Sequence, residues 1–216
     1  VVCEIANNFF SQAINGIESI AYNRGYHVII SQSHESYDRE VVNVEHLASR
    51  SVDGLLVSLS TETEHIEHFK SLHDKGFPIV FFDRITDEIE TYKVVVDNYK
   101  GAYDATQHLI DAGYTKIAHL ASSPHLSISI ERLNGYKAAL TDNGIPVNES
   151  YIKYCSHGGM IYTELEEAVK ALVQLKDRPD AIFSAGDRLT LSCLTALKSI
   201  GLTIPDDIAI VGFSNS

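Results

Sequence analysis

Short apolar runs alternate with amphipathic stretches along the whole chain, and this alternation limits the folds open to it. Continuous apolar runs such as residues 79–82 and 208–211 are typical of strands covered on both faces, as strands in parallel sheets are. Between such runs, apolar residues recur at three- and four-residue spacing, as Phe10, Ile14 and Ile17 do, which predicts helices with one buried face. Strands that alternate with helices in this way predict an α/β fold made of βαβ units around parallel sheets.

The same pattern predicts where the elements lie. Seven helices and nine strands are expected, with the strands at residues 2–6, 26–31, 54–58, 78–82, 93–96, 116–121, 151–155, 181–184 and 208–212. Five glycines follow helical stretches, where a left-handed backbone conformation can end a helix: Gly25, Gly76, Gly113, Gly144 and Gly201. Thr61 and Glu64 have the spacing of a capping box, which is expected to begin a helix.

These units form two sets. A first lobe is expected over residues 1–95 and a second over residues 96–216, joined through the predicted strand at residues 93–96. No segment rich in proline, glycine or serine separates them, so the lobes are expected to pack closely. The second lobe is expected to be incomplete at its C-terminal end, because residues 211–213 are typical of a strand end that no further element follows.

The composition limits the classes of partner that this chain is expected to bind. Of 216 residues, 17 are Lys or Arg and 29 are Asp or Glu, giving a formal net charge of −12 that would repel a phosphate backbone. Any contact with DNA is therefore expected through another part of the protein. The three cysteines, Cys3, Cys155 and Cys193, lie singly in apolar segments, which favours a reducing compartment, the cytoplasm. No run approaches the ~20 apolar residues of a membrane span, so neither a membrane span nor a signal peptide is expected.

Polar residues follow most of the predicted strands, and ligands of open parallel sheets bind at the carboxyl ends of the strands. Small polar side chains dominate this set, together with two aromatics and a few charges: Asn7, Asn8, Phe9, Phe10, Ser31, Gln32, Ser58, Ser60, Asp83, Arg84, Asp97, Asn98, Ser122, Ser123, His157, Gly186, Asp187, Ser214 and Asn215. This composition suits a polar, hydroxyl-rich small molecule held by hydrogen bonds.

Several of these residues also have a purely structural interpretation. Asp83 could cap a turn or pair with Arg84, and Asp97 and Asn98 are more typical of a helix N-cap than of a ligand contact. An arginine on a helix, as Arg132 is expected to be, is usually a solvated or ion-paired surface residue. From position alone, both interpretations of Asp83 stay open.

Aromatic and histidine pairs give two further indications. Phe9 and Phe10 are adjacent in a predicted helix, so both cannot face the core, and one is expected to point toward the ligand. His65 and His68 have a spacing that could hold a metal, but the preferred interpretation is a hydrated helix face, with no metal site.

Motifs of common catalytic and nucleotide-binding sites, such as G-x-S-x-G, G-x-x-x-x-G-K-[ST] and C-x-x-C, do not occur in the sequence. Neither an enzyme nor a cofactor is therefore expected.

An ordered set of motifs runs along the whole chain. The set comprises Asn7-Asn8-Phe9-Phe10, Ser51-Val52-Asp53-Gly54, Val95-Val96-Asp97-Asn98, Gly113-Tyr114-Thr115-Lys116-Ile117-Ala118, Glu131-Arg132-Leu133-Asn134-Gly135-Tyr136, Arg178-Pro179-Asp180-Ala181 and Ile204-Pro205-Asp206-Asp207-Ile208. It resembles the motifs of the LacI/GalR family of bacterial transcription regulators. The resemblance implies their fold, two Rossmann-like lobes with parallel sheets of the periplasmic-binding-protein-like type I.

The resemblance also implies site residues. It places Arg132 on the family's effector-binding arginine, where a guanidinium fork would offer paired donors to the ligand. It places Asp83 on a carboxylate of the ligand cleft, Phe9 and Phe10 on an aromatic pair beside the pocket, and Met160 near the position of a stacking aromatic. This assignment replaces the surface interpretation of Arg132.

The chain departs from the family pattern at two positions of the site. It has Gly186-Asp187 where the family usually has Asn-Asp, and Phe213-Ser214 where the family has Phe-Asp. Ser214 is therefore expected in the effector site in place of an aspartate. Because the missing side chains are typical partners of sugar hydroxyls, the departures argue against a common monosaccharide.

The function implied by the resemblance is that of a sensor. A small polar effector, a sugar or related metabolite, would bind between the lobes, and a homodimer would transmit this to helix-turn-helix headpieces that bind operator DNA and lie outside this chain. The alternative is a periplasmic sugar-binding protein of a transport system, against which Gly201-Leu202-Thr203-Ile204-Pro205 resembles the regulators more closely. An enzyme on a Rossmann-like sheet is a third class, without a motif to support it.

Overall fold

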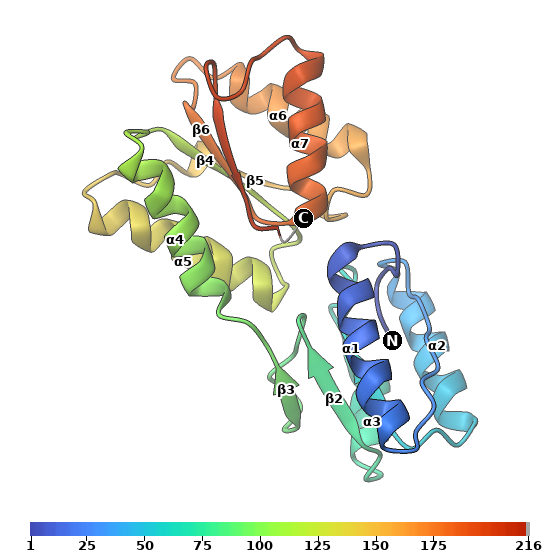
Figure 1. The fold of residues 1–216 in the computed structure, drawn as a ribbon. Helices are drawn as coiled ribbons and strands as arrows, with labels where there is room; N and C mark the ends of the chain where they lie inside the picture. The colour runs from blue at the N-terminus through green and yellow to red at the C-terminus, as the bar shows by residue number, and fades with distance from the viewer. Residues whose placement is uncertain (215–216) are drawn as a thin grey trace. The chain divides into compact units, whose positions relative to one another are not determined.

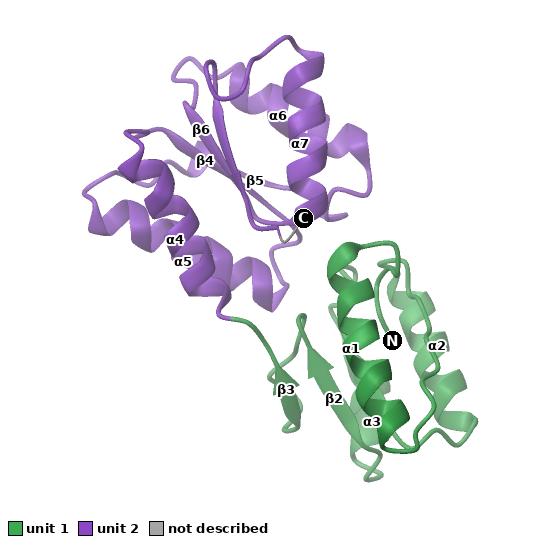
Figure 2. Cartoon of the chain, viewed as in Figure 1, with its two compact units in different colours: residues 1–96, 215 green, residues 97–214, 216 purple. Residues whose placement is uncertain are grey.

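The computed structural model describes residues 1–214, which divide into two compact units, residues 1–96 and residues 97–214 (Figure 2). Both units are layers of helices around a parallel sheet, so the α/β class predicted from the sequence is confirmed. Within the described residues, no helix combines the length and the apolar character needed to cross a bilayer.

The first unit contains a three-stranded parallel sheet with helices around it (Figure 1). Its elements are α1 (Asn8–Asn23), α2 (Tyr37–Ser49), β1 (Leu55–Val57), α3 (Glu67–His73), β2 (Ile79–Phe82) and β3 (Tyr92–Val94), and the strand order is β1-β2-β3. Val57, Phe69 and Phe81 are fully buried in its main core, and the rings of Phe69 and Phe81 meet edge to face at 5.4 Å. A second, smaller cluster joins α1 to β2 through Phe10 and Phe82.

The second unit contains a four-stranded parallel sheet with helices on both faces (Figure 1). Its elements are α4 (Asn98–Asp111), β4 (Ile117–Ala121), α5 (Ser127–Asp142), the short 3-10 helix η1 (Glu149–Tyr151), β5 (Ile152–Tyr154), α6 (Tyr162–Val173), β6 (Ala181–Ser184), α7 (Asp187–Ser199) and β7 (Ala209–Gly212). The strand order is β5-β4-β6-β7, with β4 and β6 in the interior.

Successive side chains of the inner strands β4 and β6 point to opposite faces of the sheet, so the core of the second unit has two parts, one on each face. Ile117 and Phe183 pack with Tyr136 of α5 on one face, whereas Leu120 and Ile182 pack with residues of α6 and α7 on the other. All residues of β4 and β6 are buried, as expected for strands with helices on both faces.

The helix ends follow the sequence prediction. Gly25, Gly76, Gly113, Gly144 and Gly201 all have positive φ, between 69° and 95°, just after a helix. A residue with a Cβ would be strained in this conformation, so the predicted role of these glycines is confirmed.

Two of the nine predicted strands do not form. Residues 2–6 and 26–31 form no strand, and one isolated parallel bridge joins Val2 to Gln32, the residue after the second run. The chain turns at Ile5 toward Asn7, the N-cap of α1. An apolar run forms a strand only where a neighbouring strand accepts its hydrogen bonds, which the run itself does not reveal.

The predicted capping box is also wrong. The helix α3 begins at Glu67 with Ile66 as its N-cap, so Thr61 and Glu64 lie ahead of it. The amide of Thr61 donates instead to Glu35 Oε2 at 2.9 Å. A nearby carboxylate from another segment therefore takes the hydrogen bond that the capping box would have supplied.

Candidate functional site

A buried arginine lies at the carboxyl edge of the sheet in the second unit. Arg132, on α5, is only 8% exposed. Its Nε donates to Asn98 Oδ1 at 2.9 Å, its Nη1 donates to the Ala185 carbonyl at 2.7 Å, and its guanidinium lies 3.9 Å from the centroid of the Phe213 ring. These three contacts fix the orientation of the guanidinium at this edge of the sheet.

The start of α4 supplies one of these partners. Asp97 is the N-cap of α4, with Oδ1 accepting from the Lys100 amide at 2.8 Å, as predicted. Asn98 is nearly fully buried and turns its amide oxygen to Arg132. Gly101, one turn further, leaves room for the Phe213 ring, because a Cβ there would lie 2.6 Å from that ring.

The start of α7 contributes further polar groups to the same edge. Ser214 is exposed, and its hydroxyl bonds to Asp187 Oδ1 in the first turn of α7. Met160 lies in the turn ahead of α6, 38% exposed. This turn packs closely on α7, since a Cβ on Gly159 would lie 3.1 Å from the Leu189 amide nitrogen.

Two serine hydroxyls at the ends of the inner strands are buried and have no hydrogen-bond partner among residues 1–214. These are Ser122, just after β4, and Ser184, the last residue of β6. The neighbouring Ser123 Oγ lies 3.0 Å from His125 Nδ1. Ser122 and Ser123 thus place hydroxyl groups at the carboxyl edge that carries Arg132 and Ser214.

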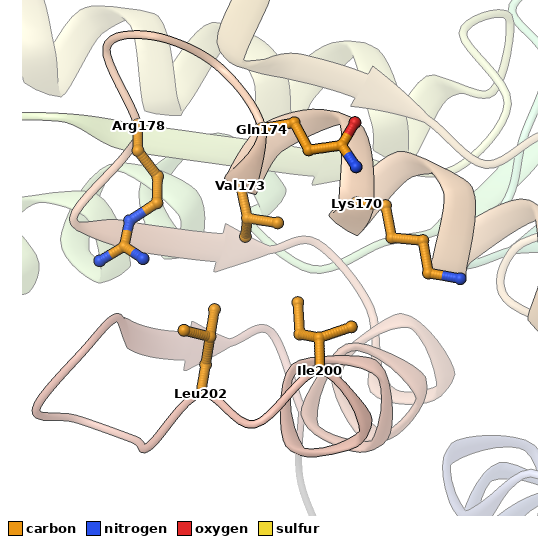
Figure 3. A pocket seen from close by; sticks show the side chains of 6 residues that line it. All are labelled: Lys170, Val173, Gln174, Arg178, Ile200 and Leu202. Atoms are coloured by element: carbon orange, nitrogen blue, oxygen red, sulfur yellow. The ribbon is translucent and has the colours of Figure 1, made fainter.

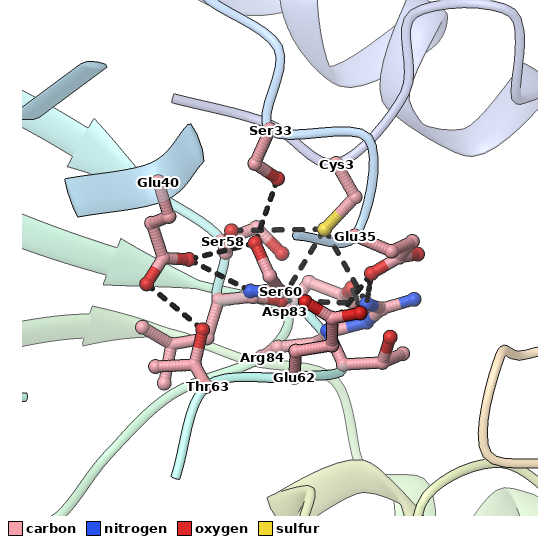
Figure 4. A network of polar contacts seen from close by, with 12 residues as sticks. Cys3, Ser33, Glu35, Glu40, Ser58, Ser60, Glu62, Thr63, Asp83 and Arg84 are labelled. Atoms are coloured by element: carbon pink, nitrogen blue, oxygen red, sulfur yellow. Dashed lines mark hydrogen bonds and ion pairs between the residues drawn. The ribbon is translucent and has the colours of Figure 1, made fainter. Parts of the chain in front are cut away.

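In the first unit, Asp83 and Arg84 lie just after β2, at the carboxyl edge of its sheet (Figure 4). Asp83 has a φ of 59°, a conformation that is uncommon for residues other than glycine and is often found at functional positions. Arg84 Nη1 binds Glu35 Oε2 at 2.6 Å, and Arg84 Nε lies 4.0 Å from Asp83 Oδ2. The predicted pairing of Asp83 with Arg84 is therefore present, and Glu35 is the closer partner.

Arg84 also determines the ionisation of Glu35. Burial alone would raise the pKa of the Glu35 carboxyl, but the charge of Arg84 and its hydrogen bond outweigh burial and lower this pKa. Arg84 donates as well to the Leu59 carbonyl at 3.3 Å, just after β1. The ion pair thus holds the loops after β1 and β2 together.

A buried carboxylate also binds the loop after β1 (Figure 4). Glu40 of α2 is fully buried and accepts from the Ser60 amide at 2.8 Å, from the Ser60 hydroxyl at 2.9 Å and from the Thr63 hydroxyl at 2.8 Å. His68 Nε2 lies 3.2 Å from Glu40 Oε1, the oxygen that also accepts from the Thr63 hydroxyl. His68 is 9% exposed, so its predicted position on a hydrated helix face is wrong.

The two aromatic residues of α1 differ in burial. Phe10 is 4% exposed and packs against Ile14 and Phe82, whereas Phe9 is only partly buried, with its ring centroid 5.3 Å from that of Phe10. Of the pair, Phe9 is therefore the one with exposed ring surface.

The structure groups the predicted site residues by unit. Arg132, Met160 and Ser214 belong to the second unit, at the carboxyl edge of its sheet. Phe9, Phe10 and Asp83 belong to the first unit. Within the described residues, no group of three or more His, Cys, Asp and Glu side chains is arranged to hold a metal ion.

Sequence reasoning missed the interactions of Glu35 and Glu40. Glu40 had a signal: it occupies the same helical stripe as the buried Val44 and Leu47, four and seven residues further on. A carboxylate in a core stripe requires buried donors, which here are Ser60 and Thr63. Glu35 had no such signal, because its partner Arg84 is distant in sequence.

The comparisons with known proteins agree on one family. Residues 1–215 match the family described as periplasmic binding proteins and sugar binding domain of the LacI family. Catabolite control protein A of Priestia megaterium is 32% identical over 217 residues, covering 100% of this chain and 64% of that protein. The chain therefore spans less than two thirds of the length of this curated relative.

Solved structures give the same answer. A candidate ribose operon repressor from Burkholderia thailandensis superposes with a TM-score of 0.90 at 32% identity, covering 100% of this chain and 78% of that one. The transcriptional regulator CelR, solved as a complex with cellobiose, has a TM-score of 0.86 at 27% identity, covering 100% of this chain and 66% of that one. The chain belongs to the family of periplasmic binding proteins and LacI-type sugar-binding domains, as its motifs had indicated.

Proposed function

We propose that this chain is the effector-sensing part of a LacI-type transcription regulator and that Arg132 is its principal effector-binding residue. The observation that supports this most directly is the fixed, buried guanidinium at the carboxyl edge of the second sheet. A planar donor set held in one orientation loses little entropy on binding, so it suits recognition of a small polar ligand. The regulators among the relatives support a regulatory role over transport or catalysis.

The proposed effector is a sugar-like or other polar metabolite. In this proposal Ser214, Asp83 and the exposed ring of Phe9 add hydrogen bonds and apolar contact, and Met160 adds further apolar contact. Phe10, which is buried, supports Phe9 instead of contacting the ligand. The cellobiose complex of CelR supports a hydroxyl-rich ligand for this site.

The wider setting is also part of the proposal. Effector binding would bias the relative arrangement of the two units, and a homodimer would transmit the change to helix-turn-helix segments that bind operator DNA in the cytoplasm. Three free, buried cysteines support a reducing compartment.

The test begins with an effector found by a thermal-shift screen of sugars, sugar phosphates, nucleobases and small organic acids, because ligands that bind the native state raise its stability. Arg132→Ala should then weaken binding by roughly 30- to 1,000-fold, since ligand atoms lose their donors in a desolvated site. Asp83→Asn keeps the shape but removes the charge, so a smaller loss, about 5- to 30-fold, is expected.

Arg39→Ala is the matched control, because Arg39 is an exposed arginine on α2. It should bind the effector as the parent does. Circular dichroism establishes that each variant is folded. If folded Arg132→Ala binds the effector as tightly as Arg39→Ala, the proposed site is wrong.

A further inference from the structure

A groove on the second unit lies at the amino edge of the sheet, opposite to the edge that carries Arg132. α6 and α7 each run back from the carboxyl edge, so their C-terminal ends lie beside the amino ends of the strands. The groove encloses about 290 Å³ between these helix ends, near the lower limit of small-molecule sites. It is lined by Lys170, Val173, Gln174, Arg178, Ile200 and Leu202 (Figure 3).

The walls of the groove are apolar. Val173, from the end of α6, faces Ile200 and Leu202, from the end of α7 and the turn after it (Figure 3). All three side chains are partly buried and pack against the core beneath α6 and α7. Their remaining exposed surface forms an apolar strip that would gain from being covered.

Both charged residues of the lining are cations, in a chain whose net charge is −12. Lys170 and Arg178 lie toward opposite ends of the groove, with Val173 between them (Figure 3). Arg178 Nη2 donates to the Asp207 carbonyl at 3.1 Å, which holds the side chain over the groove, and Lys170 Nζ lies 3.1 Å from Glu166 on its own helix.

A cation near a helix C-terminus has a simpler explanation, because it interacts favourably with the helix dipole. That explanation covers Lys170, which lies in the last turn of α6. It does not cover Arg178, which lies in the segment between α6 and β6, nor the apolar strip between the two cations.

We propose that this groove is a second small-molecule site, which binds an amphipathic anion. An apolar body would lie on Val173, Ile200 and Leu202, and a carboxylate or phosphate group would pair with Lys170 or Arg178. The site is separate from the effector site proposed above and does not depend on it. It is an additional ligand-binding site of the second unit, at the amino edge of its sheet.

The probe for this site is hexanoate, compared with hexanol and hexylammonium, which share its apolar body but not its negative charge. Hexanoate should bind with a dissociation constant on the order of millimolar, as expected for a ligand of this size. In a two-dimensional NMR titration it should shift the signals of Val173, Ile200 and Leu202. Hexanol and hexylammonium should bind more weakly at these residues.

The double variant Lys170→Ala with Arg178→Ala removes both cations from the lining. It should weaken hexanoate binding about tenfold, since each partly exposed charge contributes modestly. The matched control is Lys176→Ala with Lys198→Ala, which removes two exposed cations outside the lining, one between α6 and β6 and one in the last turn of α7. The control should bind hexanoate as the parent does. A third variant, Gln174→Trp, should block the groove from an exposed position.

Three results would overturn the proposal. The first is hexanoate shifts that fall outside the lining, and the second is equal binding of hexanol or hexylammonium. The third is a folded Lys170→Ala, Arg178→Ala variant that binds hexanoate as well as the control. The effector affinity of the Arg132 site is measured separately, so failure of either site leaves the other test intact.

Discussion

Single buried residues show most clearly what a sequence pattern can and cannot predict. Arg132 has the local pattern of a surface arginine, and its burial arises from Asn98, Ala185 and Phe213, which are distant in sequence. Only the resemblance to a family placed it in a site. Glu40, in contrast, could have been recognised from its place in the buried stripe of α2.

Removing the Glu40 carboxylate should destabilise the protein strongly. Glu40→Ala leaves the Ser60 amide and the Thr63 hydroxyl buried without an acceptor, so the free energy of unfolding should fall by about 2–4 kcal/mol in a urea titration. Glu45→Ala, on the exposed face of the same helix, is the control and should change it by less than about 0.5 kcal/mol. Equal effects of the two variants would show that the buried network contributes no stability.

His119 should make the protein sensitive to acid. It is fully buried in β4 between the rings of Tyr136 and Phe183, with both centroids 5.0 Å away. Burial, aided by the charges of Arg132 and Lys137, lowers the pKa of His119 from 6.5 to about 3. Between about pH 3 and pH 6.5, His119 binds a proton in the unfolded chain but not in the folded chain. Its contribution to the free energy of unfolding is therefore complete above pH 6.5 and is lost as the pH falls below that value.

The loss due to His119 should reach about 2 kcal/mol at pH 5. His119→Leu cannot bind the proton, so its free energy of unfolding should decrease less than that of the parent between pH 7 and pH 5. Urea titrations at the two pH values measure the difference. Parallel decreases in parent and variant would mean that His119 is protonated equally in the folded and unfolded states.

At the scale of elements, strands that lie inside a sheet were predictable and unpaired runs were not. The runs that became β4 and β6 are buried on both faces, and a solid apolar run reports that environment well. Residues 26–31 have a similar apolar run, yet Val28, Ile29 and Ile30 are 37%, 61% and 43% exposed. Composition gives the preference for a strand, but the partner strand comes from elsewhere in the molecule.

Two glycines within helices should respond in opposite ways to a methyl group. Gly135 of α5 faces α4, where a Cβ would lie 2.2 Å from the Tyr99 carbonyl oxygen and 2.9 Å from the Tyr103 amide nitrogen. Gly135→Ala should therefore force α4 and α5 apart and lower the free energy of unfolding by about 1–3 kcal/mol. A Cβ on Gly16 of α1 would meet nothing within 4 Å beyond the backbone of its own helix. Gly16→Ala should therefore raise the free energy of unfolding by about 0.5–1 kcal/mol.

Urea titrations of the two glycine variants provide each other's control, because the same substitution is made in two helices. If Gly135→Ala is stabilising, α4 and α5 are not in the close contact that the structure shows. If Gly16→Ala is destabilising, the surface of α1 around Gly16 is covered by something that the described residues do not supply.

At the scale of the whole molecule, the alternation of strands and helices predicted the α/β class, and the structure has two parallel sheets in two compact units. The candidate site was less accessible to prediction, because its residues come from loops after several strands. Local patterns identified those loops as polar. Only the ordered set of motifs along the chain assigned roles to Arg132 and Asp83.

The charge of the whole chain leads to a last prediction, that this chain by itself has no measurable affinity for duplex DNA at physiological salt. Binding to DNA depends on Lys and Arg that neutralise phosphates, and here 29 acidic residues oppose 17 basic ones. Fluorescence anisotropy of a labelled random-sequence duplex, titrated with the chain, measures this directly. A version of the chain fused to a known helix-turn-helix headpiece is the positive control and should bind in a salt-dependent manner. Tight, salt-sensitive binding by the chain alone would mean that it carries a basic surface of its own, and that DNA recognition in this protein is not confined to a separate headpiece.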